Sequence, residues 1–168
     1  MKKMKEFRKI SVIGLGLIAS SICLTLRQKD PTIKLVGYDK DKVVRNRAKK
    51  IGLCKVESNL DNAVSGSQLI ILCVPVGQMQ AVTQRLKKII EPGTTITDVG
   101  SVKLSVIEEI ESNIESVGGK YVPSHPIAGT ERSGPDAGYA GLFEGRWCIL
   151  TPTKKTNKKA LNLSLIHI

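Results

Sequence analysis

Residues 9–19 read KISVIGLGLIA, and the fold class follows from this stretch. The β-branched segment Lys9 to Gly14 predicts a short strand, and Ile18 to Gln28 predicts the helix that follows it. Between them, Gly14 to Ala19 form a GxGxxA motif. Its first glycine permits a tight turn, its second lets the backbone come close to a ligand, and its small last residue lets the helix pack against the strand.

The start of this helix is a predicted phosphate-binding site. Its first N–H groups lack partners within the helix, and the positive end of the helix dipole favours an anion. A GxGxxA motif between a strand and a helix is typical of dinucleotide-binding proteins, in which the pyrophosphate lies on these N–H groups. The alternative is a glycine turn in an unrelated α/β protein. The predicted cofactor-binding residues of this segment are Gly14, Gly16, Leu17 and Ile18.

A carboxylate at the end of the second predicted strand supports the same interpretation. That strand is Ile33 to Tyr38, and Asp39 follows it, 20 residues after Ala19. A carboxylate at this position can accept hydrogen bonds from both ribose hydroxyls and would repel a 2′-phosphate, which favours NAD over NADP. Lys40 and Arg45 lie nearby in the sequence and weaken that preference.

Strands and helices alternate along the rest of the chain. The later predicted helices are Lys42 to Ile51, Leu60 to Val64, Gln78 to Ile90 and Lys103 to Val117. The later predicted strands are Lys55 to Glu57, Leu69 to Val74, Thr94 to Val99, Tyr121 to Ser124 and, after a glycine-rich loop, Arg146 to Thr151. Repeated strand–helix–strand units imply parallel pairing with right-handed crossovers. We therefore predict an α/β fold with a doubly wound Rossmann-type sheet, mainly parallel, in the order 3-2-1-4-5-6.

Composition limits the functions to consider. A chain of 168 residues with 41% hydrophobic content suits one well-packed domain. The net charge of +11 is scattered, which indicates a soluble basic surface or a positive field that attracts a dinucleotide or a dicarboxylate. A nucleic-acid partner is not expected, because zinc-finger spacing and RNP-type aromatic motifs are missing. A membrane partner is not expected either, because no run approaches the roughly 20 apolar residues of a span.

The cysteines and the end of the chain give two further expectations. Cys23, Cys54, Cys73 and Cys148 form no CxxC pair, so we predict buried free thiols in a reducing cytoplasm and no metal site. Residues 161–168 form an apolar end, interpreted as a final buried strand or, preferably, as translated non-native sequence. The predicted division is a nucleotide-binding domain at 1–160 and a tail at 161–168.

Polar and small residues follow three of the predicted strands at the carboxyl edge of the sheet, where open α/β sheets bind ligands. Val74 and Pro75 end the fourth strand and are predicted to line the cofactor, unless Pro75 only stops the strand. His125 follows the sixth strand and can accept a proton near neutral pH, as hydride transfer from a hydroxyl-bearing carbon requires. Ser101 follows the fifth strand, placed to hydrogen-bond the histidine and a substrate hydroxyl. We predict His125 and Ser101 as the catalytic residues.

Each of these polar residues also has a structural interpretation. His125 can be a loop histidine bonded to the backbone, and Ser101 can cap the helix predicted from Lys103. Lys103 itself is expected on a solvated helix face rather than at a substrate carboxylate. Thr130 and Glu131 either face the substrate or simply form a turn.

The motifs together resemble those of a known family. GLGLIA with Asp39, then ILCVPV, DVGSVK and SHPIAGTERSGP, are similar to the prephenate and arogenate dehydrogenases of tyrosine biosynthesis. The similarity covers about residues 7 to 160 in the right order, with Ala19 in place of the more usual glycine. The SHPIAGTE segment paired with GSVK is much more specific than the glycine motif.

The resemblance implies an enzyme that oxidises prephenate with NAD and releases carbon dioxide, giving 4-hydroxyphenylpyruvate. It implies that His125 binds the ring hydroxyl and assists proton removal, and that Ser101 supports that histidine and the nicotinamide. Family members have a second, all-helical domain that forms a homodimer and supplies an arginine for the substrate carboxylate. Nothing in this sequence matches that domain. We therefore expect a fragment that turns over poorly alone, or a partner domain on another polypeptide.

Three other functions remain open at this point. Another oxidoreductase of similar architecture, such as a β-hydroxyacid or imine reductase, would carry a different catalytic motif on a following helical domain. A non-catalytic NAD-binding or regulatory module would keep its role after loss of His125. A basic nucleic-acid binder would bind DNA with a steep salt dependence.

Overall fold

Six parallel strands form the central sheet, in the order β3-β2-β1-β4-β5-β6. The computed structural model describes the backbone of residues 7–167 and the side chains of residues 7–104, 106–108 and 110–162. The strands are β1 (Lys9–Ile13), β2 (Lys34–Tyr38), β3 (Lys55–Val56), β4 (Leu69–Leu72), β5 (Thr95–Asp98) and β6 (Lys120–Val122). This arrangement confirms the doubly wound fold and the strand order predicted from the sequence.

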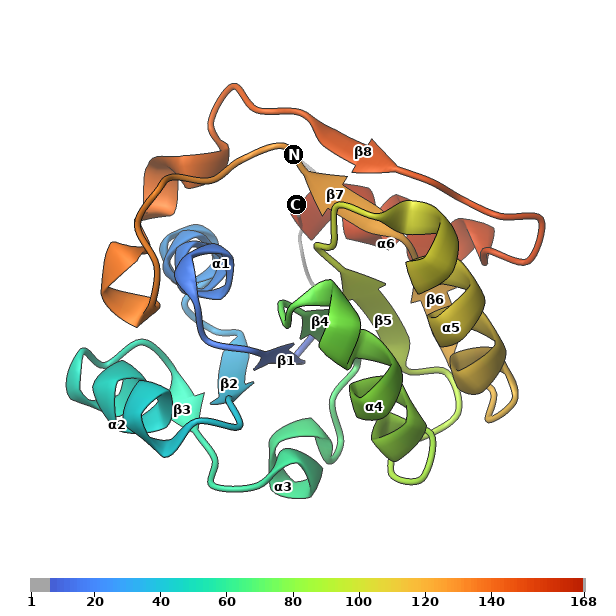
Figure 1. Cartoon of the computed structure of the whole chain (residues 1–168), viewed down its shortest axis with the longest axis horizontal. Helices are drawn as coiled ribbons and strands as arrows, with labels where there is room; N and C mark the ends of the chain where they lie inside the picture. Colours follow the sequence, from blue (N-terminus) through green and yellow to red (C-terminus); the bar gives the residue numbers. More distant parts are fainter. Residues whose placement is uncertain (1–6, 168) are drawn as a thin grey trace.

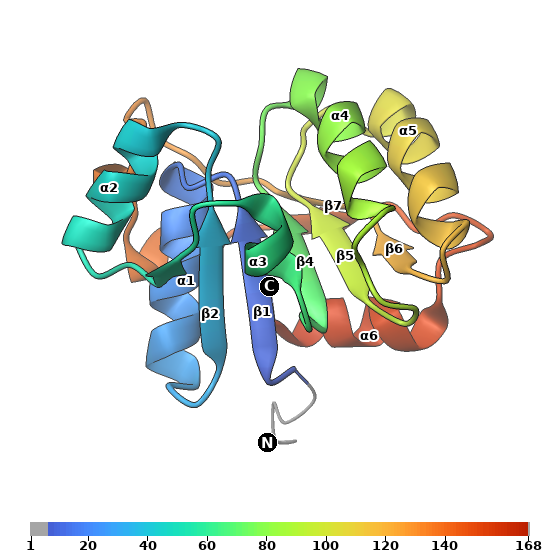
Figure 2. The same cartoon turned by 90° about the horizontal axis from the view of Figure 1, so that it is seen from below.

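Helices cover both faces of the sheet (Figures 1 and 2). One face carries α1 (Leu17–Lys29) and α2 (Lys42–Lys50). The other face carries α3 (Leu60–Val64), α4 (Val76–Leu86) and α5 (Lys103–Glu115). The first five crossovers thus place the first two helices on one side and the next three on the other, as a doubly wound sheet requires.

Each face has its own hydrophobic core, and β4 contributes to both. Its sequence LIIL is fully buried, as expected for a strand covered on two sides. Leu69 and Ile71 pack in the core that includes α1, whereas Ile70 and Leu72 pack in the core that includes α4 and α5. Successive side chains of a strand point to opposite faces, so the apolar run serves both layers.

The region after β6 differs from the prediction. The single strand predicted for Tyr121 to Ser124 is two: β6 ends at Val122, and β7 (Ser124–Pro126) leaves the main sheet. Pro123 lies between them and has no N–H for the ladder, which explains the break. β7 pairs antiparallel with β8 (Cys148–Leu150), the strand predicted within Arg146 to Thr151, and the two form a ribbon at the sheet's rim.

Residues 127–145, which we call the docked loop, connect the two strands of the ribbon and pass over α1 (Figure 1). The loop contains two short 3₁₀ helices, η1 (Pro135–Ala137) and η2 (Ala140–Phe143). Between them Gly138 touches α1 so closely that an added Cβ would lie 2.3 Å from Cβ of Ser20. The next residue, Tyr139, donates its N–H to Oγ of Ser21 at 3.1 Å. The loop is therefore anchored to the first helix.

The chain ends in a helix rather than a strand. α6 (Lys158–His167) lies on the same side of the sheet as α1, near the end where the strands begin (Figure 2). Oδ1 of Asn157 accepts the N–H of Ala160 at 3.0 Å, which caps the helix start. The buried-strand interpretation of residues 161–168 is therefore wrong for 161–167, and residue 168 lies outside the described residues. The domain boundary at 160 and the non-native origin of the tail stay predictions.

The described residues contain neither a membrane-spanning helix nor a metal-binding cluster. No helix there has both the length and the apolar character needed to cross a bilayer. Among the side chains that the structure describes, no group of three His, Cys, Asp or Glu residues is arranged to hold a metal ion. All four cysteines are free thiols, as predicted. Cys23 is buried, but the other three are half-buried, so the predicted burial is correct for Cys23 and wrong for the others.

Candidate functional site

The glycine turn after β1 is packed against the end of β4. Gly14 has a φ of +88°, a conformation that residues with a Cβ adopt rarely. An added Cβ would also lie 2.7 Å from the carbonyl oxygen of Cys73. The N–H of Gly14 donates to the carbonyl of Tyr38 at 2.8 Å, which ties the turn to the end of β2. Both backbone strain and close packing therefore require glycine here.

The second glycine of the motif faces open space. Gly16 is the N-cap of α1, it makes no side-chain capping bond, and nothing lies within 4 Å of the position of an added Cβ. The first N–H groups of a helix have no partner within it, so this uncapped end can receive an anionic group. Leu17 is buried and Ile18 is half-buried. These two predicted cofactor residues can therefore offer mainly their backbone N–H groups.

Asp39 is held in place by the backbone around it. Its Oδ2 accepts the N–H of Leu15 at 2.8 Å, and its Oδ1 accepts the N–H of Asp41 at 2.9 Å. Each carboxylate oxygen keeps further acceptor capacity for ribose hydroxyls. Arg45 donates to the carbonyl oxygens of Asp39 and Lys40, at 2.6 and 2.9 Å. Its guanidinium thus already has backbone partners.

Five of the predicted cofactor residues line a single cavity of about 350 Å³ at the carboxyl edge of the sheet. They are Gly14, Gly16, Asp39, Val74 and Pro75. A larger cavity of about 520 Å³ surrounds Gly66, Pro92 and Lys159 and contains none of the predicted site residues. The open helix start, the oriented carboxylate and the cavity between them fit the pyrophosphate and adenosine ribose of a dinucleotide.

A buried carboxylate organises the neighbouring part of the same edge. Asp98 is the last residue of β5 and its side chain is fully buried. Its Oδ1 accepts the hydroxyl of Tyr121 at 2.8 Å and the N–H of Ser124 at 3.2 Å. Burial and the charge of Asp98 raise the pKa of Tyr121 above its usual value, so this phenol remains a hydrogen-bond donor.

The other oxygen of Asp98 binds the loop that follows β5. Oδ2 accepts the N–H of Gly100 at 2.9 Å and forms an ion pair with Nζ of Lys103. The Lys103 side chain is only 14% exposed, so the prediction of a solvated helix face is wrong. The reason is that the first turn of α5 begins next to the end of β5, where a buried carboxylate needs a cation or several hydrogen-bond donors.

The two predicted catalytic residues follow directly after residues bonded to Asp98. His125 is half-buried in β7, and no hydrogen bond joins its imidazole to any residue that the structure describes. Because His125 belongs to β7, it is a strand residue and not a loop residue. Ser101 is exposed, and the N-cap of α5 is Val102 without a side-chain capping bond. The alternative role of Ser101 as the helix cap is therefore wrong.

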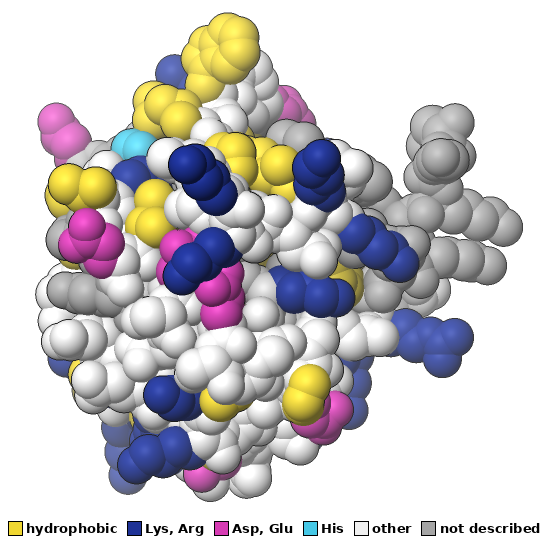
Figure 3. Space-filling model, turned by 90° about the vertical axis from the view of Figure 1, so that its right-hand side faces the viewer, with side chains coloured by type: hydrophobic (Ala, Val, Ile, Leu, Met, Phe, Trp, Pro, Cys, Tyr) yellow, Lys and Arg dark blue, Asp and Glu magenta, His cyan; other side chains and the backbone are white. Residues whose placement is uncertain are grey.

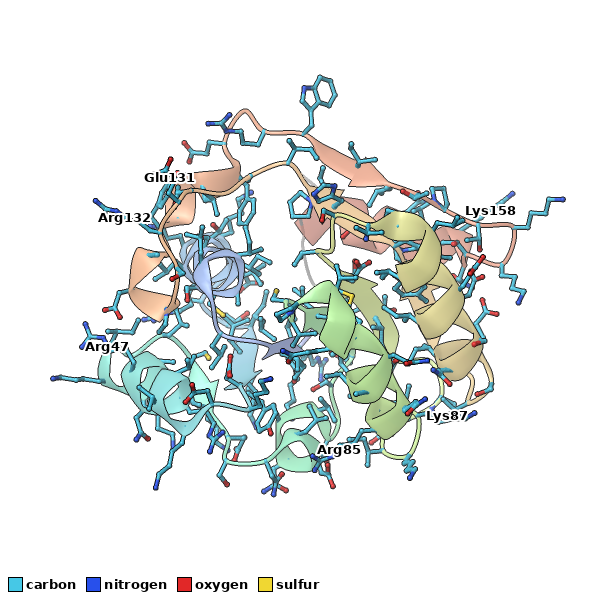
Figure 4. All side chains as sticks on the ribbon, viewed as in Figure 1. Arg47, Arg85, Lys87, Glu131, Arg132 and Lys158 are labelled. Atoms are coloured by element: carbon cyan, nitrogen blue, oxygen red, sulfur yellow. The ribbon has the colours of Figure 1, made fainter. Side chains whose placement is uncertain are left out.

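Thr130 and Glu131 lie on the docked loop, outside the cavity. Both are exposed, and Oγ1 of Thr130 accepts the N–H of Arg132 at 3.2 Å, which forms a turn. Figure 4 shows Glu131 and Arg132 on the outer side of the loop. The turn-forming role of Thr130 is thus visible in the structure, and a substrate role for Thr130 and Glu131 stays a prediction.

Sequence reasoning did not single out Asp98, Tyr121 and Ser124. One signal for Asp98 was present, because TITD places a carboxylate at the end of an otherwise buried strand. A charge in that position needs specific partners. The partners themselves come from a different strand and loop, and no spacing in the sequence indicates them.

The fold and the site together define a class of protein. A parallel sheet in this order, a glycine turn after β1, an uncapped α1 and Asp39 at the end of β2 make a Rossmann-type dinucleotide-binding domain. Residues 22–166 match the family model described as prephenate dehydrogenase, nucleotide-binding domain. The chain belongs to this family.

Individual relatives agree with this assignment. The cyclohexadienyl dehydrogenase of Zymomonas mobilis is 40% identical over 159 residues, which is 94% of this chain and 54% of that protein. The Aquifex aeolicus prephenate dehydrogenase, solved with hydroxyphenyl propionate and NAD+, is similar with a TM-score of 0.89 and 30% identity, covering 98% of this chain and 57% of that one. Synechocystis arogenate dehydrogenase gives a TM-score of 0.86 at 27% identity, covering 95% and 55%. The chain thus spans about half the length of these relatives.

Proposed function

We propose that this chain is the NAD-binding and histidine-bearing half of an enzyme of tyrosine biosynthesis. The reaction is the NAD-dependent oxidative decarboxylation of prephenate to 4-hydroxyphenylpyruvate. The observation that carries the proposal is the arrangement at one sheet edge, where the cofactor cavity lies beside the two segments that carry Ser101 and His125, which follow the adjacent strands β5 and β6. The solved relative that contains NAD+ and hydroxyphenyl propionate supports both the cofactor and an aromatic, hydroxyl-bearing ligand.

The residues around the cavity have complementary roles toward NAD. The uncapped N–H groups of α1 bind the pyrophosphate, and Gly16 leaves room for it. The fixed carboxylate of Asp39 accepts the ribose hydroxyls and disfavours a 2′-phosphate. Val74 and Pro75 form the apolar wall at the end of β4. When bound, NAD+ supplies the hydride acceptor.

His125 and Ser101 act on the hydroxyl end of the substrate. The imidazole of His125 has no described partner that would occupy it, so it is available to accept the proton of the ring hydroxyl. Ser101 is exposed beside the same network and orients the histidine and the hydroxyl. Oxidation of the ring carbon to a ketone provides the electron sink for loss of carbon dioxide with aromatisation. The task of the protein is therefore mainly positioning and hydroxyl polarisation.

The rest of the site is expected on the half that the relatives have in addition. We infer that this half supplies an arginine for the substrate carboxylate and forms a homodimer. Exposed apolar side chains lie at the start of α5 and along the β7–β8 ribbon, on the upper end of the face in Figure 3, and would be covered by that half. They are Val102, Leu104, Ile127, Trp147 and Ile149.

Arogenate is the second candidate substrate, and the similarity to the Synechocystis arogenate dehydrogenase favours it. Prephenate and arogenate differ at the side-chain end, which we expect the additional half to read. A steady-state comparison of both substrates in the full-length enzyme separates them by kcat/KM. The relatives are biosynthetic enzymes that are named as dehydrogenases of this family. Their names and the free thiols of this chain together support a cytoplasmic location.

Calorimetric titration with NAD and NADP tests the cofactor assignment directly. We expect NAD to bind more tightly than NADP, and Asp39→Ala to remove most of that preference because no carboxylate then repels a 2′-phosphate. Catalysis is tested by His125→Asn in the full-length enzyme, with a predicted fall in kcat of about 100-fold or more. Unchanged turnover in that variant would instead support a non-catalytic NAD-binding module.

A further inference from the structure

The Asp98 network consists of Asp98 and the four groups bonded to its carboxylate, from Gly100, Lys103, Tyr121 and Ser124. The backbone N–H groups in this set belong to Gly100 and Ser124. Gly100 directly precedes Ser101, and Ser124 directly precedes His125. One buried carboxylate is therefore bonded to the residue before each of the two proposed catalytic residues.

The two carboxylate oxygens of Asp98 bind separate segments of the chain. Oδ1 binds Ser124, which also donates its hydroxyl to the carbonyl oxygen of Asp98 at 2.5 Å. Oδ2 binds Gly100 at 2.9 Å. The loop after β5 has little freedom there, because an added Cβ at Gly100 would lie 3.0 Å from Cε of Met79 and 3.1 Å from Oδ2. Neither segment can shift without breaking a bond to the same side chain.

The network lies beside the cofactor cavity. Asp98 is the register partner of Leu72, the last residue of β4, and Cys73 and Val74 after it line the cavity. Burial and the charge of Asp98 both raise the pKa of Cys73. The carboxylate is fully buried and the lysine nearly so, which makes the ion pair costly to lose and geometrically well defined.

We propose that Asp98 is a positioning residue that fixes Ser101 and His125 relative to each other and to the cofactor cavity beside them. The proposal rests on the proposed function, since it concerns the same two residues. Asp98 does not line the cofactor cavity and acts through the backbone of Gly100 and Ser124. Loss of the Asp98 carboxylate should therefore change kcat, the pH profile of kcat and the NMR resonances of His125. It should change binding of the adenosine half of NAD less.

The first experiment observes His125 without requiring turnover. The chain contains two histidines, so a His167→Gln background leaves a single imidazole for NMR of labelled histidine. In this background, Asp98→Asn places an amide NH₂ toward the N–H of Gly100, where Oδ2 was, or toward the donors of Tyr121 and Ser124, where Oδ1 was. We expect the His125 resonances and titration midpoint to move. Tyr121→Phe removes one donor without changing any charge and should shift the resonances in a smaller but measurable way.

A matched control separates positioning from general loss of stability. Ser11→Ala removes a buried hydroxyl on β1 that is bonded to Ala63 and Ser67, away from the segments that carry Ser101 and His125. It should lower thermal stability and leave the His125 signals unchanged. If Asp98→Asn does not fold, Tyr121→Phe and Lys103→Met decide the question, because each removes one bond to the carboxylate and keeps the others.

The second experiment uses the full-length enzyme and separates kcat from KM. Asp98→Asn should reduce kcat about 100-fold, the scale expected for a small misplacement of reacting groups. The KM for NAD and the affinity for ADP-ribose should change by less than about twofold, since a mutation acting only on the transition state spares ground-state binding. The pH profile of kcat should move with the NMR midpoint of His125.

The outcomes distinguish the positioning role of Asp98 from the proposed function. Unchanged His125 signals in a folded Asp98→Asn chain, or equal losses in NAD binding and kcat, overturn the positioning role and leave the proposed function intact. A wild-type enzyme that neither binds NAD nor oxidises prephenate or arogenate overturns the proposed function. In that case the NMR shifts still report whether Asp98 sets the geometry of the segments that carry Ser101 and His125.

Discussion

Arg47 on α2 and Asp136 in η1 form a two-pronged ion pair between segments 89 residues apart in the sequence. Nε of Arg47 lies 2.7 Å from each carboxylate oxygen, and Nη2 donates to Oδ1 as well. Figure 4 shows Arg47 directed from α2 toward the docked loop. Because α2 begins just after Asp39, this pair links the loop that follows His125 to the helix beside the cavity that Asp39 lines.

Breaking this pair should loosen the loop more than it weakens the fold. Both side chains are about half exposed, so water and salt screen the interaction. Arg47→Gln should increase hydrogen exchange at the backbone of residues 135–143 and leave the global unfolding midpoint almost unchanged. The matched control is Arg85→Gln, which breaks an equally exposed pair with Asp61 far from the loop. Equal exchange in both variants would show that the pair does not anchor the loop.

The same pair predicts a pH dependence of loop docking. Arg47 holds the pKa of Asp136 below its usual range. A carboxyl group with a lowered pKa in the docked state stabilises docking fully above its undocked pKa of about 3.9 and loses that effect as pH falls through the docked value. Loop exchange should therefore be independent of pH near neutrality and increase in acid. Asp136→Asn should abolish the acid-dependent part.

Gly138 tests how closely the docked loop must approach α1. A Cβ at this position would lie 2.3 Å from Cβ of Ser20 and 2.9 Å from the helix backbone, so Gly138→Ala must displace the loop. We expect a loss of about 1–3 kcal/mol in the free energy of unfolding, the usual cost of overpacking. Gly129→Ala in the same loop has no atom within 4 Å of the new Cβ and should be tolerated. Urea denaturation of both variants measures the difference.

The two motif glycines should have opposite phenotypes. Gly14→Ala places a Cβ 2.7 Å from the carbonyl of Cys73 at a φ of +88°, and should cost roughly 2–4 kcal/mol of stability. Gly16→Ala meets no atom within 4 Å and should fold normally, but its methyl group occupies the approach to the uncapped helix. NAD affinity should fall about tenfold or more in that variant, equivalent to at least about 1.4 kcal/mol. Normal NAD affinity in Gly16→Ala would argue against pyrophosphate binding at this turn.

The main sheet was predictable because its signals are local. GLGLIA, the apolar LIILCV run and the regular spacing of the helices specify the crossovers, and the handedness rule leaves few topologies. The residues of the cofactor cavity follow from the same rule, since the ends of adjacent parallel strands meet at one edge. Asp39, Val74 and Pro75 are examples, and the structure places all three around one cavity.

The rest depends on contacts between distant segments. The partners of Asp98 come from residues up to 26 positions away, and Lys103 is buried because of that carboxylate rather than because of its helical position. The break at Pro123 creates β7, whose partner β8 lies beyond the docked loop. Such pairings leave no periodic trace in one sequence, so the ribbon and the environment of Lys103 were not predicted.

Trp147 provides a test of the proposed contact between this chain and the additional half of the enzyme. It is the single tryptophan of the chain, it is 82% exposed, and its carbonyl oxygen accepts the N–H of Ile127 at 2.7 Å, next to the β7–β8 ribbon. In the chain alone we expect emission typical of a solvated indole and ready quenching by acrylamide. In the full-length protein the covering half should shift the emission to the blue and protect the indole from acrylamide, because burial removes the indole from water.

The contribution of Trp147 is isolated by subtracting the spectrum of Trp147→Phe. An equally quenchable Trp147 in both forms would place the interface elsewhere, and the exposed apolar ribbon would then need a different partner.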